Sequence, residues 1–193
     1  VRMRNTQKGP FARCEIEIRS PEALIALARQ QRVYFAEAMW TWFSPIARWV
    51  KDCLQQGKFG DVRRCLVDCR TNSRYYAPRV TDPAAAGGAL LDMGVYAVYY
   101  LYKLFGRPDG ITCSGLVDRG IDWHEEIIFH YENHPLLAGP TDLTALVSID
   151  DETGPTSLKL EGSKASIFLP ELHYAGRASF LTADREECSI TGD

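Results

Sequence analysis

The sequence lacks the short motifs that most often identify a nucleotide-dependent or metal-dependent enzyme. Its 193 residues contain no GxGxxG, no GxxxxGK[ST], no HExxH and no GxSxG. The usual signals of a dinucleotide site, a phosphate-binding loop, a zinc protease and an α/β-hydrolase are therefore missing. None of the six cysteines forms a CxxC pair, so buried free thiols are expected.

An excess of charge of either sign is also absent. The chain has 22 Lys and Arg against 25 Asp and Glu, a net charge of −3, which argues against a nucleic-acid binder. No apolar run reaches the ~18 residues that a membrane span needs, and residues 1–5 lack the apolar core of a secretory signal. We therefore expect a cytoplasmic protein that binds neither nucleic acid nor membrane.

The residues that are present indicate an ordinary globular protein, with 46% hydrophobic and 24% charged residues. Ser-Pro pairs predict the starts of two helices, and a third, largely apolar helix follows a long loop. The expected helices cover residues 20–31, 44–57 and 89–105; strands are expected at 33–36, at 61–71 and at six places between 111 and 182. Helices followed by a run of strands predict an α+β fold, an open antiparallel sheet with helices packed on one face.

The third helix carries the most informative candidate site. Asp92 is its only acid, and burial of an unpaired carboxylate is unfavourable by several kcal/mol, so its presence needs a reason. Tyr96 lies four residues on, and Tyr99 and Tyr100 continue the same stripe. Together an acid and a phenol can donate a proton or polarise a carbonyl. Alternatively, Asp92 caps amides of the Gly87-Gly88 loop and the tyrosines fill a core.

Other aromatic residues are candidates for the wall of a substrate pocket, although aromatics also fill cores. These pocket candidates are Trp40, Trp42, Phe43, Tyr75 and Tyr76. His124 and His173 are the candidate bases by residue type, and we group them, with Tyr99 and Tyr100, among the substrate-binding residues. Histidines and glutamates alternate over residues 124–134, but a solvated sheet face explains that pattern, so no metal site is expected.

Three sequence blocks resemble the Gfo/Idh/MocA oxidoreductases, and most of all their dimeric dihydrodiol dehydrogenase branch. The blocks are EAMWTWFSP at 37–45, GKFGDV at 57–62 and DPAAAGGALLDMGVY at 82–96. In that family a Rossmann domain binds NAD(P), and a second, α/β domain covers the nicotinamide and forms dimers. The resemblance implies that residues 37–193 are the substrate and dimerisation domain, and that residues 1–36 are a remnant of the end of the cofactor domain.

The resemblance also has gaps. The family's catalytic lysine, in a Glu-Lys-Pro motif ahead of the first helix, is replaced, by Ala12 or by Ile16 according to the alignment. The helix positions of the family's aspartate and tyrosine are retained as Asp92 and Tyr96, which makes them the expected catalytic pair. Because the glycine-rich loop is missing as well, no cofactor site is expected.

Several functions fit these observations. We expect a cofactor-independent biosynthetic enzyme of secondary metabolism, a cyclase or isomerase that closes a ring in a small apolar substrate held in a repurposed dehydrogenase pocket. The alternatives are a fragment of an NAD(P)-dependent dihydrodiol or sugar dehydrogenase, a non-catalytic binding or dimerisation module, and a dehydratase or lyase. The resemblance favours a homodimer formed through the open face of the sheet.

Overall fold

The computed structural model describes residues 2–5, 14–17, 21–75, 77–151, 156–174, 176–182 and 187–191. Contacts between residues divide the chain into two compact units. Unit 1 comprises residues 1–38 and unit 2 comprises residues 39–193. The candidate site lies entirely within unit 2.

Unit 1 contains a two-stranded antiparallel sheet and one helix. Strands β1 (Arg2–Asn5) and β2 (Cys14–Glu17) pair with each other, and α1 (Pro21–Gln31) begins at the predicted proline. The strand predicted at 33–36 is wrong, because residues 33–39 have no regular secondary structure and Tyr34 is 94% exposed. An extended segment becomes a strand only beside a partner, and among the described residues of unit 1 the two strands use each other.

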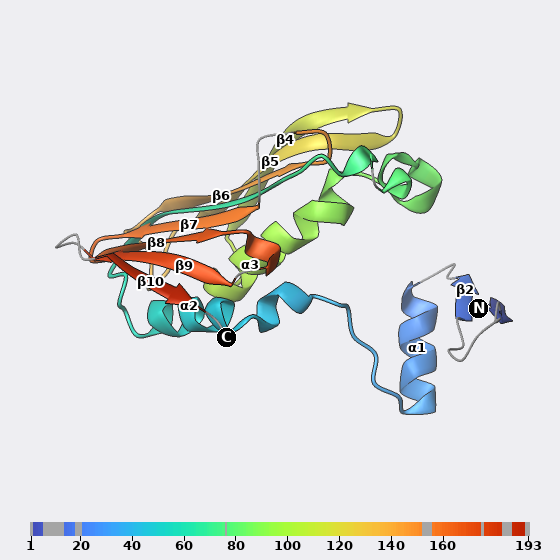
Figure 1. The fold of residues 1–193 in the computed structure, drawn as a ribbon, viewed down its shortest axis with the longest axis horizontal. Coiled ribbons are helices and arrows are strands. Elements are labelled where there is room, and N and C mark those ends of the chain that lie inside the picture. Colours follow the sequence, from blue (N-terminus) through green and yellow to red (C-terminus); the bar gives the residue numbers. More distant parts are fainter. Residues whose placement is uncertain are drawn as a thin grey trace. The chain divides into compact units, whose positions relative to one another are not determined.

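Unit 2 is built on one eight-stranded sheet, which Figure 1 shows with α3 and α2 beside it. The strands are β3 (Val62–Arg70), β4 (Gly110–Asp118), β5 (Ile121–Tyr131), β6 (Thr141–Ser148), β7 (Ser157–Gly162), β8 (Ala165–Pro170), β9 (Arg177–Thr182) and β10 (Glu187–Thr191). Their order is β10-β9-β8-β7-β3-β6-β5-β4. Neighbours are antiparallel except for β3 and β6, which run parallel. The predicted α+β fold with an open sheet is confirmed, with this one parallel pair added.

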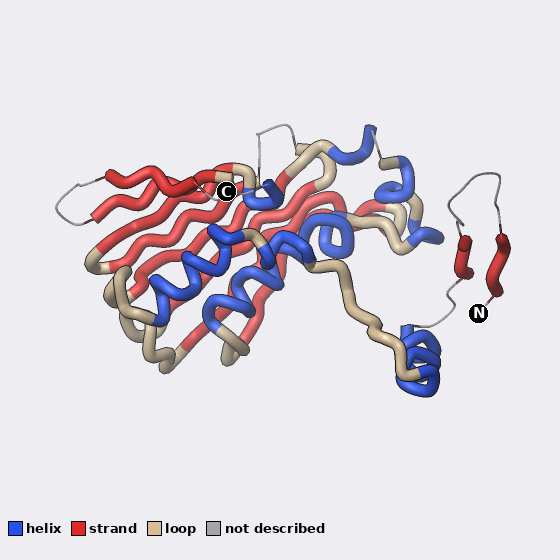
Figure 2. The backbone as a smooth tube through the Cα atoms, turned by 60° about the horizontal axis from the view of Figure 1, so that its bottom comes forward, coloured by secondary structure: helices blue, strands red, loops and turns tan. Residues whose placement is uncertain are grey.

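The two long helices of unit 2 cover the same face of the sheet, as Figure 2 shows. They are α2 (Pro45–Gln55) and α3 (Val95–Phe105). The shorter helical segments are η1 (Trp40–Phe43), η2 (Ser73–Tyr75), η3 (Pro78–Thr81), η4 (Pro83–Ala85), the π-helical η5 (Leu90–Gly94) and η6 (Leu172–Tyr174). Segments η5 and α3 form one continuous helix that lies against β3 and β6.

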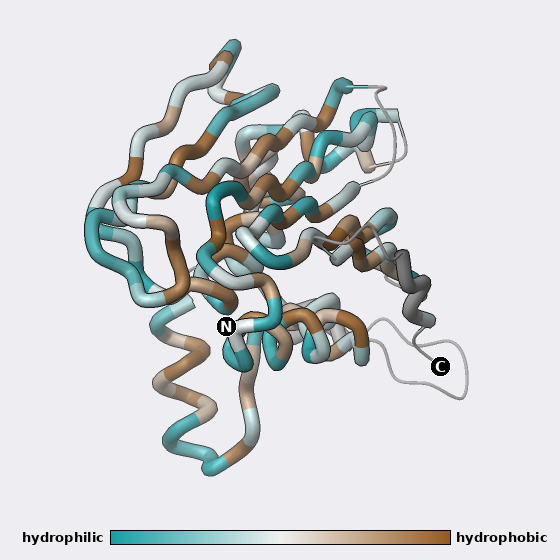
Figure 3. The backbone as a smooth tube through the Cα atoms, turned by 90° about the vertical axis from the view of Figure 1, so that its left-hand side faces the viewer, coloured by the Kyte–Doolittle hydropathy of each residue, from teal (hydrophilic) through white to brown (hydrophobic). Residues whose placement is uncertain are grey.

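Alternation along the strands decides which residues enter the core. In β5 the side chains of Ile127, Phe129 and Tyr131 are at most 5% exposed, whereas the residues between them are partly exposed. Leu143, Ala145 and Val147 of β6 follow the same period of two. Figure 3 shows the resulting exchange of hydrophobic and hydrophilic residues along the strands. One face of the sheet therefore packs on the helices, and the other, which we call the open face, is mixed in polarity.

By length and composition the helical stretch Pro83–Phe105 could cross a membrane, with a mean hydropathy of 1.2. Within it, Ala97, Leu101 and Leu104 belong to the hydrophobic core of unit 2. Packing against the sheet explains this apolar character without a membrane.

Candidate functional site

The π-helical segment η5 places Asp92 in a mostly buried position beside one cation. Nη2 of Arg79 donates a hydrogen bond to Oδ1 of Asp92 over 2.6 Å. The Asp92 side chain is 11% exposed, whereas that of Arg79 is 65% exposed. Arg79, which the sequence analysis missed, therefore supplies the counter-charge that a buried carboxylate needs. Two arginines lie in the long loop at 72–88, and the neighbouring sequence does not indicate which of them pairs with Asp92.

The next turn of the helix brings Tyr96 against His173, which comes from η6. The two rings meet edge to face, with their centroids 4.5 Å apart. The same imidazole also lies near Trp40, with 6.2 Å between ring centroids. Segments almost eighty residues apart thus meet at one point, and Figure 1 shows η6 lying beside α3.

The two ring nitrogens of His173 have different surroundings. Nδ1 shares a hydrogen bond of 2.9 Å with Oγ1 of Thr156, and the donor depends on the tautomer. Nε2 is buried and has no hydrogen-bond partner among the described residues. A buried polar atom without a partner is uncommon and asks for an explanation. A bound molecule that hydrogen-bonds to Nε2 would provide one.

Burial lowers the pKa of His173 below its usual 6.5, and the negative charge of Asp92 opposes this shift. Because desolvation is the larger cause, the imidazole is neutral at neutral pH. A neutral imidazole can accept a proton. We call the group of Trp40, Arg79, Asp92, Tyr96 and His173 the acid–histidine cluster.

Three of the predicted pocket residues lie instead in or against the core. Trp42 packs edge to face on Tyr99 and Tyr100, with centroid distances of 6.2 and 5.5 Å. Trp42 and Tyr100 are buried, and Tyr99 carries the ammonium of Lys103 over its ring at 5.2 Å. Trp42 and Tyr100 thus follow the alternative that the sequence left open, in which the aromatic residues fill a core.

We expect Tyr100→Phe to lower the free energy of unfolding by about 1 kcal/mol, because the buried Tyr100 hydroxyl donates to the Thr41 carbonyl at 3.0 Å. Urea unfolding measures the change, and Tyr102→Phe, at a half-exposed ring of the same helix, is the matched control. Equal stabilities for the two variants would contradict this assignment.

The remaining predicted site residues lie outside the acid–histidine cluster. Phe43 and Tyr75 are more than 60% exposed, and each lies under the guanidinium of a nearby arginine, Arg48 for Phe43 and Arg74 for Tyr75. Tyr76 lies outside the described residues.

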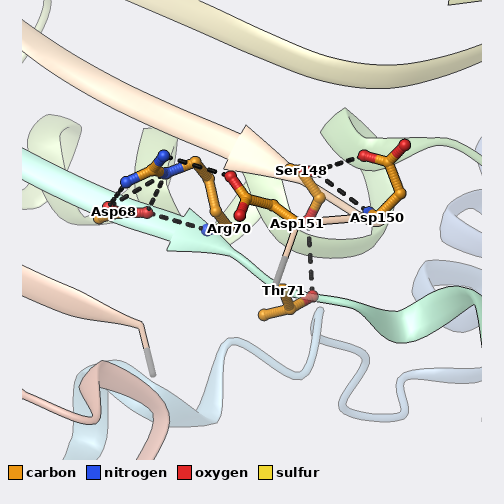
Figure 4. Close-up of polar contacts among 6 residues, drawn as sticks. All are labelled: Asp68, Arg70, Thr71, Ser148, Asp150 and Asp151. Atoms are coloured by element: carbon orange, nitrogen blue, oxygen red, sulfur yellow. Dashed lines mark hydrogen bonds and ion pairs between the residues drawn. The ribbon is translucent and has the colours of Figure 1, made fainter. Parts of the chain in front are cut away.

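His124 lies on the open face, at a polar hollow of about 840 Å³. Figure 4 shows the network beside it, in which Arg70 binds Asp68 at 2.7 Å and Asp151 at 3.2 Å. The first ion pair lies within β3, and the second joins the end of β3 to Asp151 in the segment after β6. Because His173 contacts Tyr96 of α3, on the face covered by helices, the sheet separates it from His124. Within the described parts of the chain, no three His, Cys, Asp or Glu side chains converge on a point where a metal ion could bind.

A dinucleotide phosphate does not fit the one glycine pair that precedes a helix. The start of η5 is already occupied, because Oδ2 of Asp122 accepts the Leu90 N–H at 2.6 Å. A phosphate placed there would meet a carboxylate instead of free backbone amides. We therefore assign no phosphate-binding role to Gly87-Gly88.

The fold matches part of several solved oxidoreductases. An inositol dehydrogenase homolog from Azotobacter vinelandii, solved with NAD+, superposes with a TM-score of 0.71 at 15% identity, over 88% of this chain and 46% of that one. A levoglucosan dehydrogenase, solved with NADH and levoglucosan, gives 0.69 at 12% identity, over 88% and 50%. At these identities the likeness shows the fold alone.

The sequence model of the GFO/IDH/MocA C-terminal domain matches residues 47–168, well over half of the chain. The chain therefore belongs to the Gfo/Idh/MocA family, as the three sequence blocks predicted.

Its relatives include several trans-1,2-dihydrobenzene-1,2-diol dehydrogenases. The mouse protein is 29% identical over 165 residues, covering 77% of this chain and 49% of its own length. The Xenopus laevis protein is 29% identical over 177 residues, covering 88% and 51%. The human protein is 34% identical over 111 residues, covering 56% and 33%. The chain thus spans about half the length of these relatives or less.

These relatives overturn one expectation. The prediction of a cofactor-independent cyclase, isomerase or lyase of secondary metabolism is wrong in its class, because the relatives and structural neighbours are dehydrogenases and oxidoreductases. Taken alone, the missing glycine-rich loop favours a reaction other than dehydrogenation. The matched region, however, corresponds to only about half of each relative, so the loop's absence from this chain does not indicate a new reaction.

Proposed function

We propose that this chain is the substrate-binding part of a dehydrogenase that acts on a small cyclic molecule with neighbouring hydroxyl groups. The observation that carries the proposal is the buried, unpartnered Nε2 of His173 beside Tyr96 and within electrostatic range of Asp92. Dehydrogenation of an alcohol requires one group that takes the hydroxyl proton and an acceptor for the hydride, such as the NAD+ with which one structural neighbour was solved. A neutral imidazole meets the first of these requirements.

The surroundings of His173 suit such a proton transfer. When Nδ1–H donates to Thr156, the lone pair of Nε2 is available to the substrate hydroxyl. The imidazolium that forms is then stabilised by the negative charge of Asp92. The Tyr96 hydroxyl is a second hydrogen-bonding group on the same helix face as Asp92. His173 and Tyr96 are thus the residues that we expect to touch substrate.

The substrate class follows from the mixture of an aromatic face and polar groups. Trp40, 45% exposed, offers a flat apolar surface, and the Arg79–Asp92 pair offers a donor and an acceptor for hydroxyls. Among the relatives and neighbours, one group is named for a dihydrobenzene diol, and one was solved with levoglucosan. A ring bearing hydroxyl groups fits these features better than a wholly apolar molecule.

Titration of the chain with trans-cyclohexane-1,2-diol, followed by the NMR signals of the histidine rings, tests the proposal. We expect saturable binding that His173→Phe weakens at least about tenfold, because the acceptor nitrogen is lost while an aromatic ring is retained. His134→Phe is the matched control, since His134 also packs between aromatic rings, those of Phe105 and Tyr131, away from the cluster.

Two results would argue against the proposal. Equal affinity in His173→Phe and the wild-type chain would separate His173 from the substrate. Saturable binding of NAD(H) by this chain alone would contradict the expectation that it holds no cofactor site.

We further propose that the open face of the sheet forms a homodimer. Phe168 and Leu181, on the neighbouring strands β8 and β9, are 44% and 40% exposed on that face, and the two long helices of unit 2 cover the opposite face. An exposed apolar patch of this kind indicates an interaction site. Light scattering should give a dimeric mass that Phe168→Asp reduces to a monomer. Tyr102→Asp, on the helical side, should leave the dimer intact; a monomeric wild-type chain would contradict the proposal.

Unit 1 also presents apolar surface. A groove of about 580 Å³ runs between α1 and the segment after it, and is lined by Leu24, Ile25, Val33 and Phe35, among others. We propose that residues 1–36 are the end of a cofactor-binding domain and that this groove packs against the rest of such a domain. This interpretation explains why an apolar Val-Tyr-Phe segment lies exposed at 33–35.

A further inference from the structure

A second acidic residue, at the start of β5, contacts the helical segment that carries Asp92. Oδ2 of Asp122, at the start of β5, accepts the N–H of Leu90 at 2.6 Å. Leu90 is the first residue of the π-helical turn that carries Asp92, and its N–H would otherwise be one of the free donors of a helix start. We infer that Asp122 is a positioning residue that fixes the π-helical turn and so holds Asp92 against Arg79 in the acid–histidine cluster.

The register of the sheet explains why Asp122 can reach the helix. In the β4–β5 pair, Leu116 lies opposite His124 and Val117 opposite Asp122, so β5 has one extra residue at this point. Such a bulge reverses the alternation of side chains, and it brings Asp122 to the same side as Glu125. Without the bulge, Asp122 would share the open face with His124.

Glu125 strengthens this arrangement. It hydrogen-bonds to Asp122, and burial together with the Asp122 charge raises the pKa of Glu125 above its usual 4.5. Burial and the charges of Glu125 and Asp122 also raise the pKa of the Cys113 thiol. When Glu125 is protonated it can donate to Asp122, which then accepts hydrogen bonds from a carboxyl and from the Leu90 backbone amide.

The loop before the helix is shaped to the same carboxyl. Gly88 has φ +131°, and a Cβ at that position would come 1.8 Å from Oδ1 of Asp122. The Gly88 carbonyl in turn accepts the N–H of Asp92 at 3.2 Å. The contact therefore connects Asp122 to Asp92 through the Leu90 amide on one side and through Gly88 on the other. A one-residue shift of the π-helical turn would move Asp92 away from Arg79.

The consequence is measurable without substrate, through the electrostatic coupling between Asp92 and His173. The coupling is the amount by which Asp92→Asn lowers the pKa of His173 in an NMR titration. In an Asp122→Ala chain we expect this coupling to fall below about half of its wild-type size. Asp122→Asn should preserve it, because the amide oxygen still accepts the Leu90 N–H. Asp118→Ala, at an exposed acid of β4, is the matched control.

A measurement on the wild-type chain covers the case in which Asp122→Ala does not fold. The amide proton of Leu90 should shift with pH as Glu125 titrates, because Glu125 hydrogen-bonds to Asp122, the acceptor of the Leu90 N–H. Undiminished coupling in Asp122→Ala, equal losses in the Asn and Ala variants, or a Leu90 amide insensitive to the titration of Glu125 would each overturn the inference.

The inference rests on the proposed function for the roles of Asp92 and His173. Its test does not use the diol, however, so the two can fail separately. Intact coupling with no diol binding would count against the proposed function alone. Diol binding through His173 with no effect of Asp122 on the coupling would count against the positioning role alone.

Discussion

Gly88→Ala should lower the free energy of unfolding by about 3 kcal/mol or more. Two causes add. The backbone at Gly88 has φ +131°, which residues with a Cβ rarely adopt, and the new methyl group would overlap Oδ1 of Asp122. Relief of the overlap requires Asp122 to release the Leu90 amide, which leaves a helix-start donor unsatisfied.

Gly57→Ala separates these two causes. Gly57 also has a positive φ, +67°, but a Cβ there would meet nothing within 4 Å. We expect only the backbone term, about 1 to 2 kcal/mol. Thermal or urea unfolding of both variants gives the comparison. If Gly88→Ala were no less stable than Gly57→Ala, the close contact between Gly88 and Asp122 would not exist in solution.

Local patterns predicted the elements of unit 2 but not all of their pairing. Proline at the first helical position marks the start of α2, and alternation in β6 marks which side chains are buried, because both features depend only on neighbours along the chain. The parallel pairing of β3 with β6 could not be predicted in this way. The two strands are separated by α3 and by the β4–β5 hairpin, and nothing in their own residues records that β6 returns to lie beside β3.

The candidate site shows the same limit at the level of single residues. The spacing of Asp92 and Tyr96 predicted a shared helix, and both lie on the continuous helix formed by η5 and α3. His173 could be proposed only by its residue type, and Arg79 was missed, because both reach the cluster from distant segments. The bulge in β5 was equally hidden, since a strand with one extra residue has no distinctive composition.

Binding of a hydroxylated ring through His173 should weaken as the pH falls. The folded chain lowers the pKa of His173, chiefly by burial, so the neutral acceptor form persists below pH 6.5, the usual pKa, and is lost only when the pH passes below the lowered value. Beneath that value affinity should fall about tenfold for each pH unit, because the protonated ring has no lone pair to offer. The groups that face this imidazole are Asp92, Tyr96 and Thr156.

The free energy of unfolding should also decrease as the pH falls. A histidine with a lowered folded-state pKa binds fewer protons when folded, so its contribution is complete above pH 6.5 and is lost as the pH falls toward the folded pKa. His173→Gln should remove this dependence from both the diol titration and the unfolding curve, whereas His134→Gln should leave the diol titration unchanged. Asp92→Asn should move the loss of binding to lower pH, because the charge that favours the imidazolium is gone. A pH profile that is identical in His173→Gln and in the wild-type chain would show that another group titrates, and would remove His173 from the site.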